Sequence, residues 1–389
     1  SCQNEHWRST SVSADSFVQS CRESGLVCTS QELINWGGKP DLTDSLSTIA
    51  MPRLPDAGGS VRRRENPQFM DEALSLGRIA SFANSDSQSN NGGEDASSLQ
   101  STGHTLELLS FTSLDEYQEW QNRSHALLSD RRRDELTQAP PGRAFRLSGQ
   151  CFVCAAPTDF QTTWDYAFKQ NGVLTPNWRE QLLCPGCGLN GRMRATVHLL
   201  ESELRAELDS NSYITEQTSP LYRALVERHP GIVGSEFLRD GTPTGEVNRS
   251  GLRHEDLTRL SCADESFDLI VSLDVLEHVP SYEQALAEAY RVLRPGGTFF
   301  FTAPFQPDSA SNLVRARLRR DGTVEHLQPP EYHYDPLEEG GVLSFYLFGW
   351  ELLQRVREAG FADVTAQVCH SVEYGYWGPY HVYFRALRP

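Results

Sequence analysis

Residues 266–280 read S-F-D-L-I-V-S-L-D-V-L-E-H-V-P, and residues 285–304 read A-L-A-E-A-Y-R-V-L-R-P-G-G-T-F-F-F-T-A-P. The nearly unbroken apolar run Phe267–Leu273 is typical of a strand that is buried on both faces of a parallel sheet. Ser281, with Gln284 three residues later, predicts the start of a helix. The triplet Pro295-Gly296-Gly297 ends that helix, and the apolar run Thr298–Thr302 predicts the next strand.

The preceding residues continue this alternation of strands and helices. Short strands are expected at Tyr213–Thr215 and Ile232–Leu238. Between them, Ser219 as N-cap and Pro220 in the first turn predict a helix. Alternating β and α elements of this kind predict a doubly wound, Rossmann-like α/β sheet.

The two quoted stretches closely resemble the class I S-adenosylmethionine-dependent methyltransferases, in particular the small-molecule and quinone-type group. The resemblance is strong over about 40 residues and extends with less detail over residues 192–389. It implies a seven-stranded methyltransferase sheet, S-adenosylmethionine as cofactor, and an enzyme that transfers one-carbon groups. It says almost nothing about the acceptor.

The resemblance also assigns cofactor contacts by position. Glu216 matches the acid beside the methionine portion, and Glu236 matches the acid that accepts hydrogen bonds from both ribose hydroxyls. Asp256 matches the acceptor of the adenine amino group, with Leu257 against the ring, and Asp274 stands where cofactor and acceptor meet. For each acid the alternative is a helix cap or a solvated loop carboxylate.

One departure from the family concerns its glycine-rich loop. Where an acid followed by G-x-G is expected, this chain has Glu216-Gln-Thr-Ser-Pro-Leu. S-adenosylmethionine carries no phosphate, so the demand for glycine is weaker than in a pyrophosphate-binding loop. The hydroxyls of Thr218 and Ser219 are candidates for contacts with the methionine group. A weakened cofactor site, or a non-catalytic binding domain with this fold, is the alternative.

An insert at residues 304–345 is expected to cover the acceptor. Methyl transfer to a hydroxyl requires alignment and removal of a proton, for which histidine has a suitable pKa. His278, in the D-V-L-E-H-V stretch, and His333, in E-Y-H-Y-D-P, are the main candidates for the catalytic group, with Asp274 beside them and His254 as a weaker candidate. We therefore expect O-methylation of a small molecule or glycan.

Two cysteine pairs, Cys151-Phe-Val-Cys154 and Cys184-Pro-Gly-Cys187, precede the sheet. Each C-x-x-C turn presents two thiolates to one ion, and two turns complete a tetrahedral shell. Residues 146–191 are therefore predicted to form a structural zinc module, with 29 intervening residues packed on the site. Two disulfides or a redox C-x-x-C motif are the alternatives.

Residues 1–110 are rich in serine and show no sustained strand pattern, which predicts a flexible or loosely folded extension that could dock a protein partner. In residues 111–145, a capping box of Ser113 and Glu116 predicts a helical linker running toward Leu136. The chain begins without Met, which suggests a processed protein or a piece of a longer one.

Charge and hydropathy bear on whether the chain binds nucleic acid or spans a membrane. The chain has 52 acidic and 35 basic residues, a net charge of −17, which disfavours binding to a nucleic-acid backbone. The arginines between Arg315 and Arg320 are interpreted as a solvated helix face, and an RNA-directed methyltransferase that grips RNA with its zinc module is the alternative. No run of roughly 18 apolar residues predicts a membrane span, and a cytoplasmic protein is expected.

Overall fold

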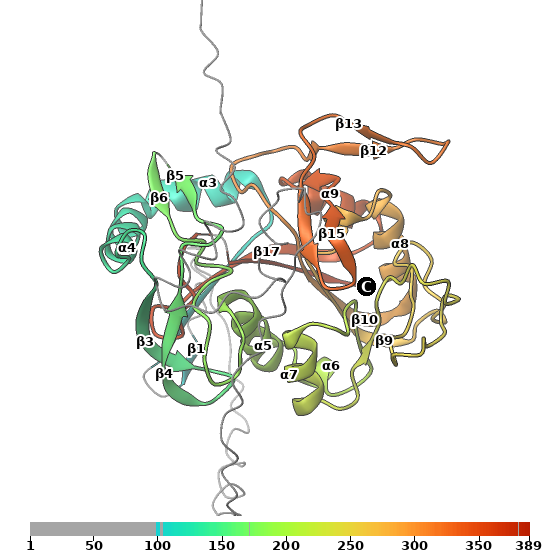
Figure 1. The fold of residues 1–389 in the computed structure, drawn as a ribbon, viewed down its shortest axis with the longest axis horizontal. Coiled ribbons are helices and arrows are strands. Elements are labelled where there is room, and N and C mark those ends of the chain that lie inside the picture. Colours follow the sequence, from blue (N-terminus) through green and yellow to red (C-terminus); the bar gives the residue numbers. More distant parts are fainter. Residues whose placement is uncertain (1–98, 102–103, 171, 380) are drawn as a thin grey trace, which may run out of the picture. The chain divides into compact units, whose positions relative to one another are not determined.

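The computed structural model describes residues 99–101, 104–170, 172–379 and 381–389 (Figure 1). These described residues all belong to one compact unit. The prediction of a flexible extension falls on residues that are not described, except at its C-terminal end. No helix of the described residues is long and apolar enough to cross a membrane.

An eight-stranded sheet in the order β1-β2-β17-β18-β10-β9-β7-β8 organises this unit. Parallel pairing joins β7, β8, β9 and β10, while β18 runs antiparallel between β10 and β17. The strands are β1 (Leu99–Ser101), β2 (His104–Phe111), β7 (Ser212–Ile214), β8 (Val233–Gly234), β9 (Phe267–Leu273), β10 (Leu293–Thr302), β17 (Ala362–His370) and β18 (Val382–Leu387). The doubly wound α/β prediction is confirmed.

Helices cover both faces of the sheet (Figure 1). One core joins the sheet side chains Ile270, Phe299 and Phe301 to α8 and α9, and the other joins Val271 and Phe300 to α5 and α7. The helices are α5 (Gly191–Glu203), α6 (Arg205–Leu208), α7 (Pro220–Arg228), α8 (Tyr282–Val292) and α9 (Glu351–Glu358). Ser219 caps α7 as predicted: its Oγ accepts a hydrogen bond of 2.9 Å from the backbone N–H of Tyr222.

Several predicted elements differ in detail. The strand expected at Ile232–Leu238 is reduced to β8, and a further parallel strand is reduced to one bridge between Glu236 and His254. Ser281 stands at the start of α8 without a side-chain capping hydrogen bond. The predicted single helix breaks at Ser124 into α3 (Leu114–Arg123) and α4 (His125–Thr137). Ser113 caps α3 by accepting from the backbone N–H of Glu116, but the Glu116 carboxylate accepts from the N–H of Thr112 rather than that of Ser113.

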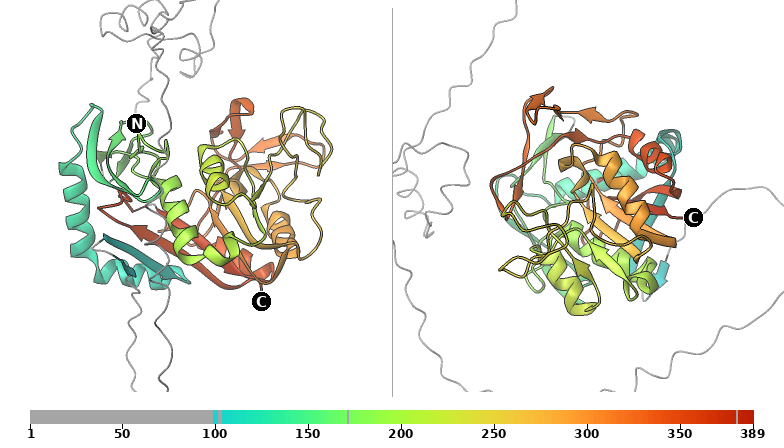
Figure 2. Two further views of the ribbon diagram at one scale, coloured as in Figure 1. Left: turned by 90° about the horizontal axis from the view of Figure 1, so that it is seen from below. Right: turned by 90° about the vertical axis from the view of Figure 1, so that its right-hand side faces the viewer.

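The N-terminal boundary of the sheet was predicted too late in the chain. β2 pairs antiparallel with β17 from Phe111 against Ala366 to Glu107 against His370 (Figure 2). The described part of residues 99–110 therefore belongs to the sheet rather than to a loose extension. The error has a physical reason: β2 pairs with a strand about 260 residues later in the chain, so no local sequence pattern predicts it.

The cysteine pairs lie in a layer of short antiparallel strands that precedes α5. These are β3 (Phe145–Cys151), β4 (Ala156–Thr162), β5 (Phe168–Gln170) and β6 (Val173–Thr175). Trp178 is buried in a small core with Leu147 and Phe160, whereas Tyr166 is exposed. The expected packing of the intervening residues on the cysteines thus holds for Trp178 and is wrong for Tyr166.

The insert after β10 consists of short strands and contains no helix. They are β11 (Leu313–Val314), β12 (Ala316–Leu318), β13 (Val324–His326), β14 (Tyr332–Asp335), β15 (Glu338–Leu343) and β16 (Tyr346–Leu347). The arginine run therefore lies on and beside β12, so the interpretation as a helix face is wrong. Arg315 pairs with Glu331 at 2.8 Å, and Arg319 pairs with Glu325 at 3.1 Å.

Candidate functional site

The carboxyl ends of three neighbouring parallel strands carry the predicted acids. Glu216 follows β7, Glu236 follows β8, and Asp274 follows β9 directly. Because parallel strands end at the same edge of a sheet, the fold brings these three side chains to one edge. The sequence prediction placed them there, and the structure supplies their partners.

Glu236 is bound to the loop that replaces the glycine-rich turn. Its Oε1 accepts hydrogen bonds from the backbone N–H groups of Gln217 and Thr218 at 2.7 and 2.8 Å, and from the Thr218 hydroxyl at 2.8 Å. Gln217 in turn accepts a hydrogen bond from the backbone N–H of Arg253 at 2.6 Å. The loop is therefore ordered by side chains where the family uses glycine backbone, and Thr218 contacts Glu236 rather than standing free.

Glu216 has an incomplete set of partners. Its Oε1 is buried and accepts no hydrogen bond from the described residues. Burial raises the pKa of Glu216 to about 7, against the opposing effect of the positive charge of Arg192. A buried carboxylate oxygen without a hydrogen bond costs free energy, and the raised pKa of Glu216 reflects that cost.

Asp274 is held by two arginines that the sequence analysis did not identify. Arg179 donates to both carboxylate oxygens, at 2.7 and 2.9 Å, and Arg192 lies 3.4 Å away. The Thr302 hydroxyl donates a further bond of 2.8 Å, and Asp274 has a left-handed backbone with φ of 52°. Although burial opposes ionisation, these arginines keep the pKa of Asp274 well below its usual range. Asp274 is thus a fixed anion.

Glu180 completes this charged network. Its carboxylate pairs with Arg179 at 2.5 Å and with Arg192 at 2.9 Å. Arg179 and Glu180 come from the segment between the two cysteine pairs, 95 residues before Asp274. No sequence spacing could have found this pairing, because it arises from tertiary contact between the cysteine layer and the sheet edge.

The predicted adenine contacts lie on the loop before β9. Asp256 Oδ1 accepts bonds from the backbone N–H and the hydroxyl of Thr258, at 2.9 and 2.7 Å. Leu257 is buried within the core on the α8 and α9 face. His254 Nδ1 donates a hydrogen bond of 2.7 Å to the Thr242 carbonyl. These contacts do not test a role toward adenine, and that role stays a prediction.

Two of the predicted histidines, His278 and His333, lie next to each other. His278 ends the short helix η1 (Leu276–His278), and its Nε2 lies 3.2 Å from Nδ1 of His333 on β14. Glu277, which the sequence analysis did not select, is fully buried beside both rings. The neighbouring Glu277 carboxylate raises the pKa of His333. The structure therefore brings together the two histidines that the sequence singled out.

The insert holds this histidine pair against the sheet edge. The Phe345 N–H donates to the Glu277 carbonyl at 2.7 Å, and the Tyr346 hydroxyl donates to the Pro280 carbonyl at 2.7 Å. Arg239, in the loop after β8, pairs with Glu338 of the insert at 3.1 Å. The insert thus contacts the loops that follow both β8 and β9, and its expected position over an acceptor stays a prediction.

The four cysteines form one cluster. The sulfur atoms of Cys151 and Cys187 lie 3.8 Å apart, as do those of Cys154 and Cys184. A tetrahedral ion with Zn–S bonds of about 2.3 Å requires sulfur spacings of about 3.8 Å. The spacing therefore fits zinc, and it is too long for the S–S bond of a disulfide. Gly188, directly after Cys187, has a left-handed backbone with φ of 73°, a conformation that favours glycine.

Arg194 joins the cysteine layer to the methyltransferase-like sheet. Its buried guanidinium donates to the Leu182 carbonyl at 3.0 Å and the Gly375 carbonyl at 3.3 Å, and it lies 3.8 Å from the Phe160 ring. Tyr374, Tyr376 and Trp377 are buried in this contact, so they pack against the cysteine layer.

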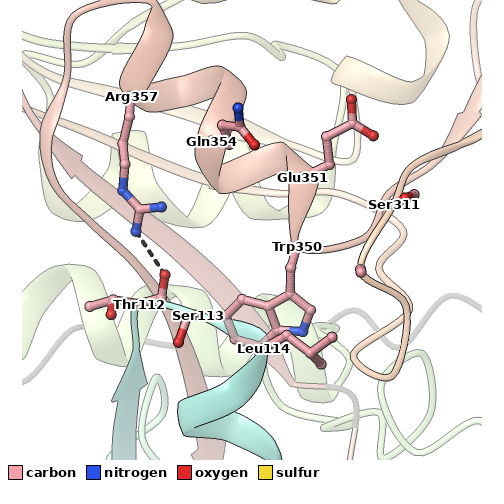
Figure 3. A pocket seen from close by; sticks show the side chains of 9 residues that line it. Thr112, Ser113, Leu114, Ser311, Trp350, Glu351, Gln354 and Arg357 are labelled. Atoms are coloured by element: carbon pink, nitrogen blue, oxygen red, sulfur yellow. Dashed lines mark hydrogen bonds between the residues drawn. The ribbon is translucent and has the colours of Figure 1, made fainter.

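A pocket elsewhere has a different character (Figure 3). It lies between the start of α3 and the helix α9, where Arg357 donates a hydrogen bond of 2.8 Å to the Thr112 carbonyl. Its lining includes Trp350 and Glu351, and none of the acids or histidines described above. The pocket lies where the N-terminal segment meets α9, and it is separate from the candidate site.

Comparison with known proteins adds independent information. Residues 236–301 match the family model described as a methyltransferase domain. A probable S-adenosylmethionine-dependent methyltransferase of Mycolicibacterium smegmatis is 41% identical over 56 residues, 14% of this chain and 22% of that protein. The sarcosine/dimethylglycine N-methyltransferase of Halorhodospira halochloris is 35% identical over 102 residues, 26% of this chain and 30% of that protein.

The demethylmenaquinone methyltransferase of Thermus thermophilus is 32% identical over 143 residues, which cover 34% of this chain and 63% of that protein. The chain thus spans less than two thirds of the length of each of these relatives. The matched segment contains β9, α8 and most of β10, and it includes Glu236, Asp256 and Asp274.

Proposed function

We propose that this chain is a class I S-adenosylmethionine-dependent methyltransferase that transfers a methyl group from S-adenosylmethionine to an oxygen of a small molecule or glycan, which its similarity to methyltransferases supports. The observation that carries the proposal is the set of acids at the carboxyl ends of β7, β8 and β9, next to the His278–His333 pair. The bound cofactor supplies a methyl group on a sulfonium, which is a good leaving group.

Two of these acids fit the cofactor. The buried Oε1 of Glu216, which lacks a donor among the described residues, is suited to a methionine ammonium group. Glu236 uses Oε1 for the loop, which leaves Oε2 to accept from a ribose hydroxyl. We assign Asp256 and Leu257 to the adenine, and Thr218 and Ser219 to positioning the loop under the methionine group.

Asp274 is proposed as a positioning residue. Its pKa is held low by Arg179 and Arg192, so it does not accept the acceptor's proton at neutral pH. Together with Arg179, it is proposed to hold in place the sheet edge between the cofactor and the insert, where the acceptor would enter. His278 and His333 remain the groups that face the acceptor, because they are the partly exposed members of their cluster.

We also propose that Cys151, Cys154, Cys184 and Cys187 bind one structural zinc ion. Four thiolates complete the coordination shell and leave no position for a substrate. The ion therefore folds the layer that delivers Arg179, and it takes no part in the chemistry. Thiolate ligands are consistent with a reducing compartment such as the cytoplasm.

Calorimetric titration with S-adenosylmethionine tests the proposal. We expect the wild-type chain to bind, and Glu236→Ala to lose at least about tenfold in affinity because the ribose acceptor and the loop anchor disappear together. Glu246→Ala, an exposed acid on the same loop region, is the matched control. Absence of binding by the wild-type chain would support the non-catalytic alternative.

The acceptor atom needs a second measurement. Transfer of a labelled methyl group to panels of hydroxylated and amino-bearing small molecules would separate O-methylation from N-methylation. Label on RNA but not on small molecules would favour the RNA-directed alternative. Label on nitrogen alone would overturn the assignment to oxygen.

A further inference from the structure

We propose that Glu277, His278 and His333 form a binding site for a divalent transition-metal ion beside the methyl-transfer centre. The three donor atoms are close together: His278 Nε2 to His333 Nδ1 is 3.2 Å, Glu277 Oε1 to His278 Nε2 is 3.6 Å, and Glu277 Oε1 to His333 Nδ1 is 3.5 Å. Ligands at about 2.1 Å from one ion lie roughly 3.0–3.4 Å apart, so a small inward adjustment completes the triangle.

Glu277 provides the independent sign of a missing partner. Its side chain is 0% exposed, and neither carboxylate oxygen forms a hydrogen bond with the described residues. A buried carboxylate without hydrogen bonds is costly, and proteins retain one where it is paired or coordinates a metal. The nearest cationic candidates are the two imidazoles, both beyond 3.4 Å.

Outer hydrogen bonds set which nitrogen of each ring faces the cluster. His278 Nδ1 lies 2.9 Å from the Leu343 carbonyl, which can only accept, so Nδ1 carries the proton and Nε2 offers a lone pair. His333 Nε2 lies 3.2 Å from a Glu331 carboxylate oxygen, which leaves the Nδ1 lone pair directed inward. Carbonyl and carboxylate partners of this kind are typical of metal-bound histidines.

These tautomers bring three electron-pair donors together around one point. Two imidazole lone pairs at 3.2 Å and a carboxylate oxygen repel one another unless a positive charge lies between them. A proton on His333 Nδ1 would form one hydrogen bond to His278 at 3.2 Å and leave Glu277 with only an ion-pair contact at 3.5 Å. A metal ion bonds to all three, and for that reason we favour it.

The donor set indicates the class of ion. Two imidazoles and one carboxylate suit Mn, Fe, Co or Zn in the divalent state, whereas Mg²⁺ and Ca²⁺ prefer oxygen ligands. Three protein ligands also leave positions open, which is the pattern of catalytic sites. The side chains of His278 and His333 are 17% and 30% exposed, so the open side is accessible.

The role of the ion rests on the proposed function. An acceptor hydroxyl that occupies an open position becomes more acidic and releases its proton to solvent. An oxygen electron pair then forms the bond to the methyl carbon, while the carbon–sulfur bond breaks and its pair stays on sulfur. This arrangement favours acceptors whose reacting hydroxyl has a neighbouring oxygen, since two oxygens can share the ion.

Titration with Mn²⁺, followed by electron paramagnetic resonance of the free ion, tests the site in full-length protein that retains zinc. We expect one Mn²⁺ per chain in the wild type and at least a tenfold weaker affinity in both Glu277→Gln and His333→Ala. His326→Ala, an exposed histidine of the same insert, is the matched control and should bind as the wild type does.

The outcomes separate the two proposals. If the wild type binds neither Mn²⁺ nor Co²⁺ beyond the cysteine cluster, or if Glu277→Gln binds as well as wild type, the metal site is overturned. S-adenosylmethionine binding, measured by calorimetry on the same samples, tests the proposed function separately. Circular dichroism of each variant distinguishes loss of a ligand from loss of folding.

Discussion

The cysteine cluster and the Glu277–His278–His333 cluster are both groups of metal-ligand side chains, and they differ in chemistry and in access. The first has four sulfur atoms, enough for the complete tetrahedral shell that we propose, in a layer that Arg194 connects to the core. The second has two nitrogens and one oxygen, at the sheet edge, with an open side. The same molecule thus separates a cluster suited to stability from one suited to chemistry.

Replacing one sulfur ligand should have the largest effect. Cys184→Ser removes a zinc ligand, and we expect zinc to be lost and the melting temperature to fall by roughly 10 °C or more, because structural zinc contributes directly to folding free energy. Metal analysis and calorimetric melting measure both. Cys262→Ser, outside the cluster, should leave zinc and melting nearly unchanged. Equal zinc in both variants would contradict the closed-site interpretation.

Arg179→Ala tests whether the cysteine layer acts on the sheet edge. It removes the two-bond partner of Asp274, and each charge-assisted bond is worth about 1.5–3 kcal/mol. We therefore expect a tenfold or larger loss in S-adenosylmethionine affinity or methyl transfer, with zinc retained. Arg146→Ala, exposed on β3, is the control. Unchanged binding and transfer in Arg179→Ala would mean that the two regions are independent.

The affinity for S-adenosylmethionine should depend on pH through Glu216, whose pKa is raised to about 7 by burial. As pH falls from 8 to 6 the carboxylate becomes neutral and loses its attraction for the methionine ammonium. Affinity for S-adenosylmethionine should therefore fall by up to about tenfold over this range. Glu216→Gln should bind more weakly at pH 8 and show a flat profile. A profile in the variant as steep as in wild type would remove Glu216 from the cofactor site.

Removing a ligand from the open cluster should have the smallest effect on stability. In chelator-treated protein that retains zinc, Glu277→Gln eliminates a buried carboxylate without hydrogen bonds. We expect its melting temperature to lie within a few degrees of wild type or slightly above it. Mn²⁺ should raise the wild-type value and leave the variant unchanged. A large destabilisation of the variant would place Glu277 among structural groups, like Cys184.

The sequence was sufficient where signals are local. The apolar run of β9, the Ser219 cap and the two C-x-x-C turns each depend on neighbouring residues, and the structure contains all three. The resemblance also placed Glu216 and Glu236 at one sheet edge, because parallel strands impose that arrangement.

Contacts between distant parts of the chain could not be predicted from the sequence. The pairing of Arg179 with Asp274, and of β2 with β17, depends on packing between segments far apart in the chain. Glu277 stood beside a selected histidine and was still missed, because burial without a hydrogen-bond partner cannot be read from residue type. Its signal was the quoted D-V-L-E-H-V stretch, in which the acid and the histidine are adjacent.

The pairing of β2 with β17 has a practical consequence. A shortened chain that begins at residue 192 would look complete from its sequence motifs, yet it would lack both β2 and the cysteine layer. The hydrogen-bonding groups of β17 from Ala366 to His370 would then be open to strands of other molecules, a common route to aggregation. A recombinant protein that begins before residue 99 contains β2, and β17 then has no unpaired edge.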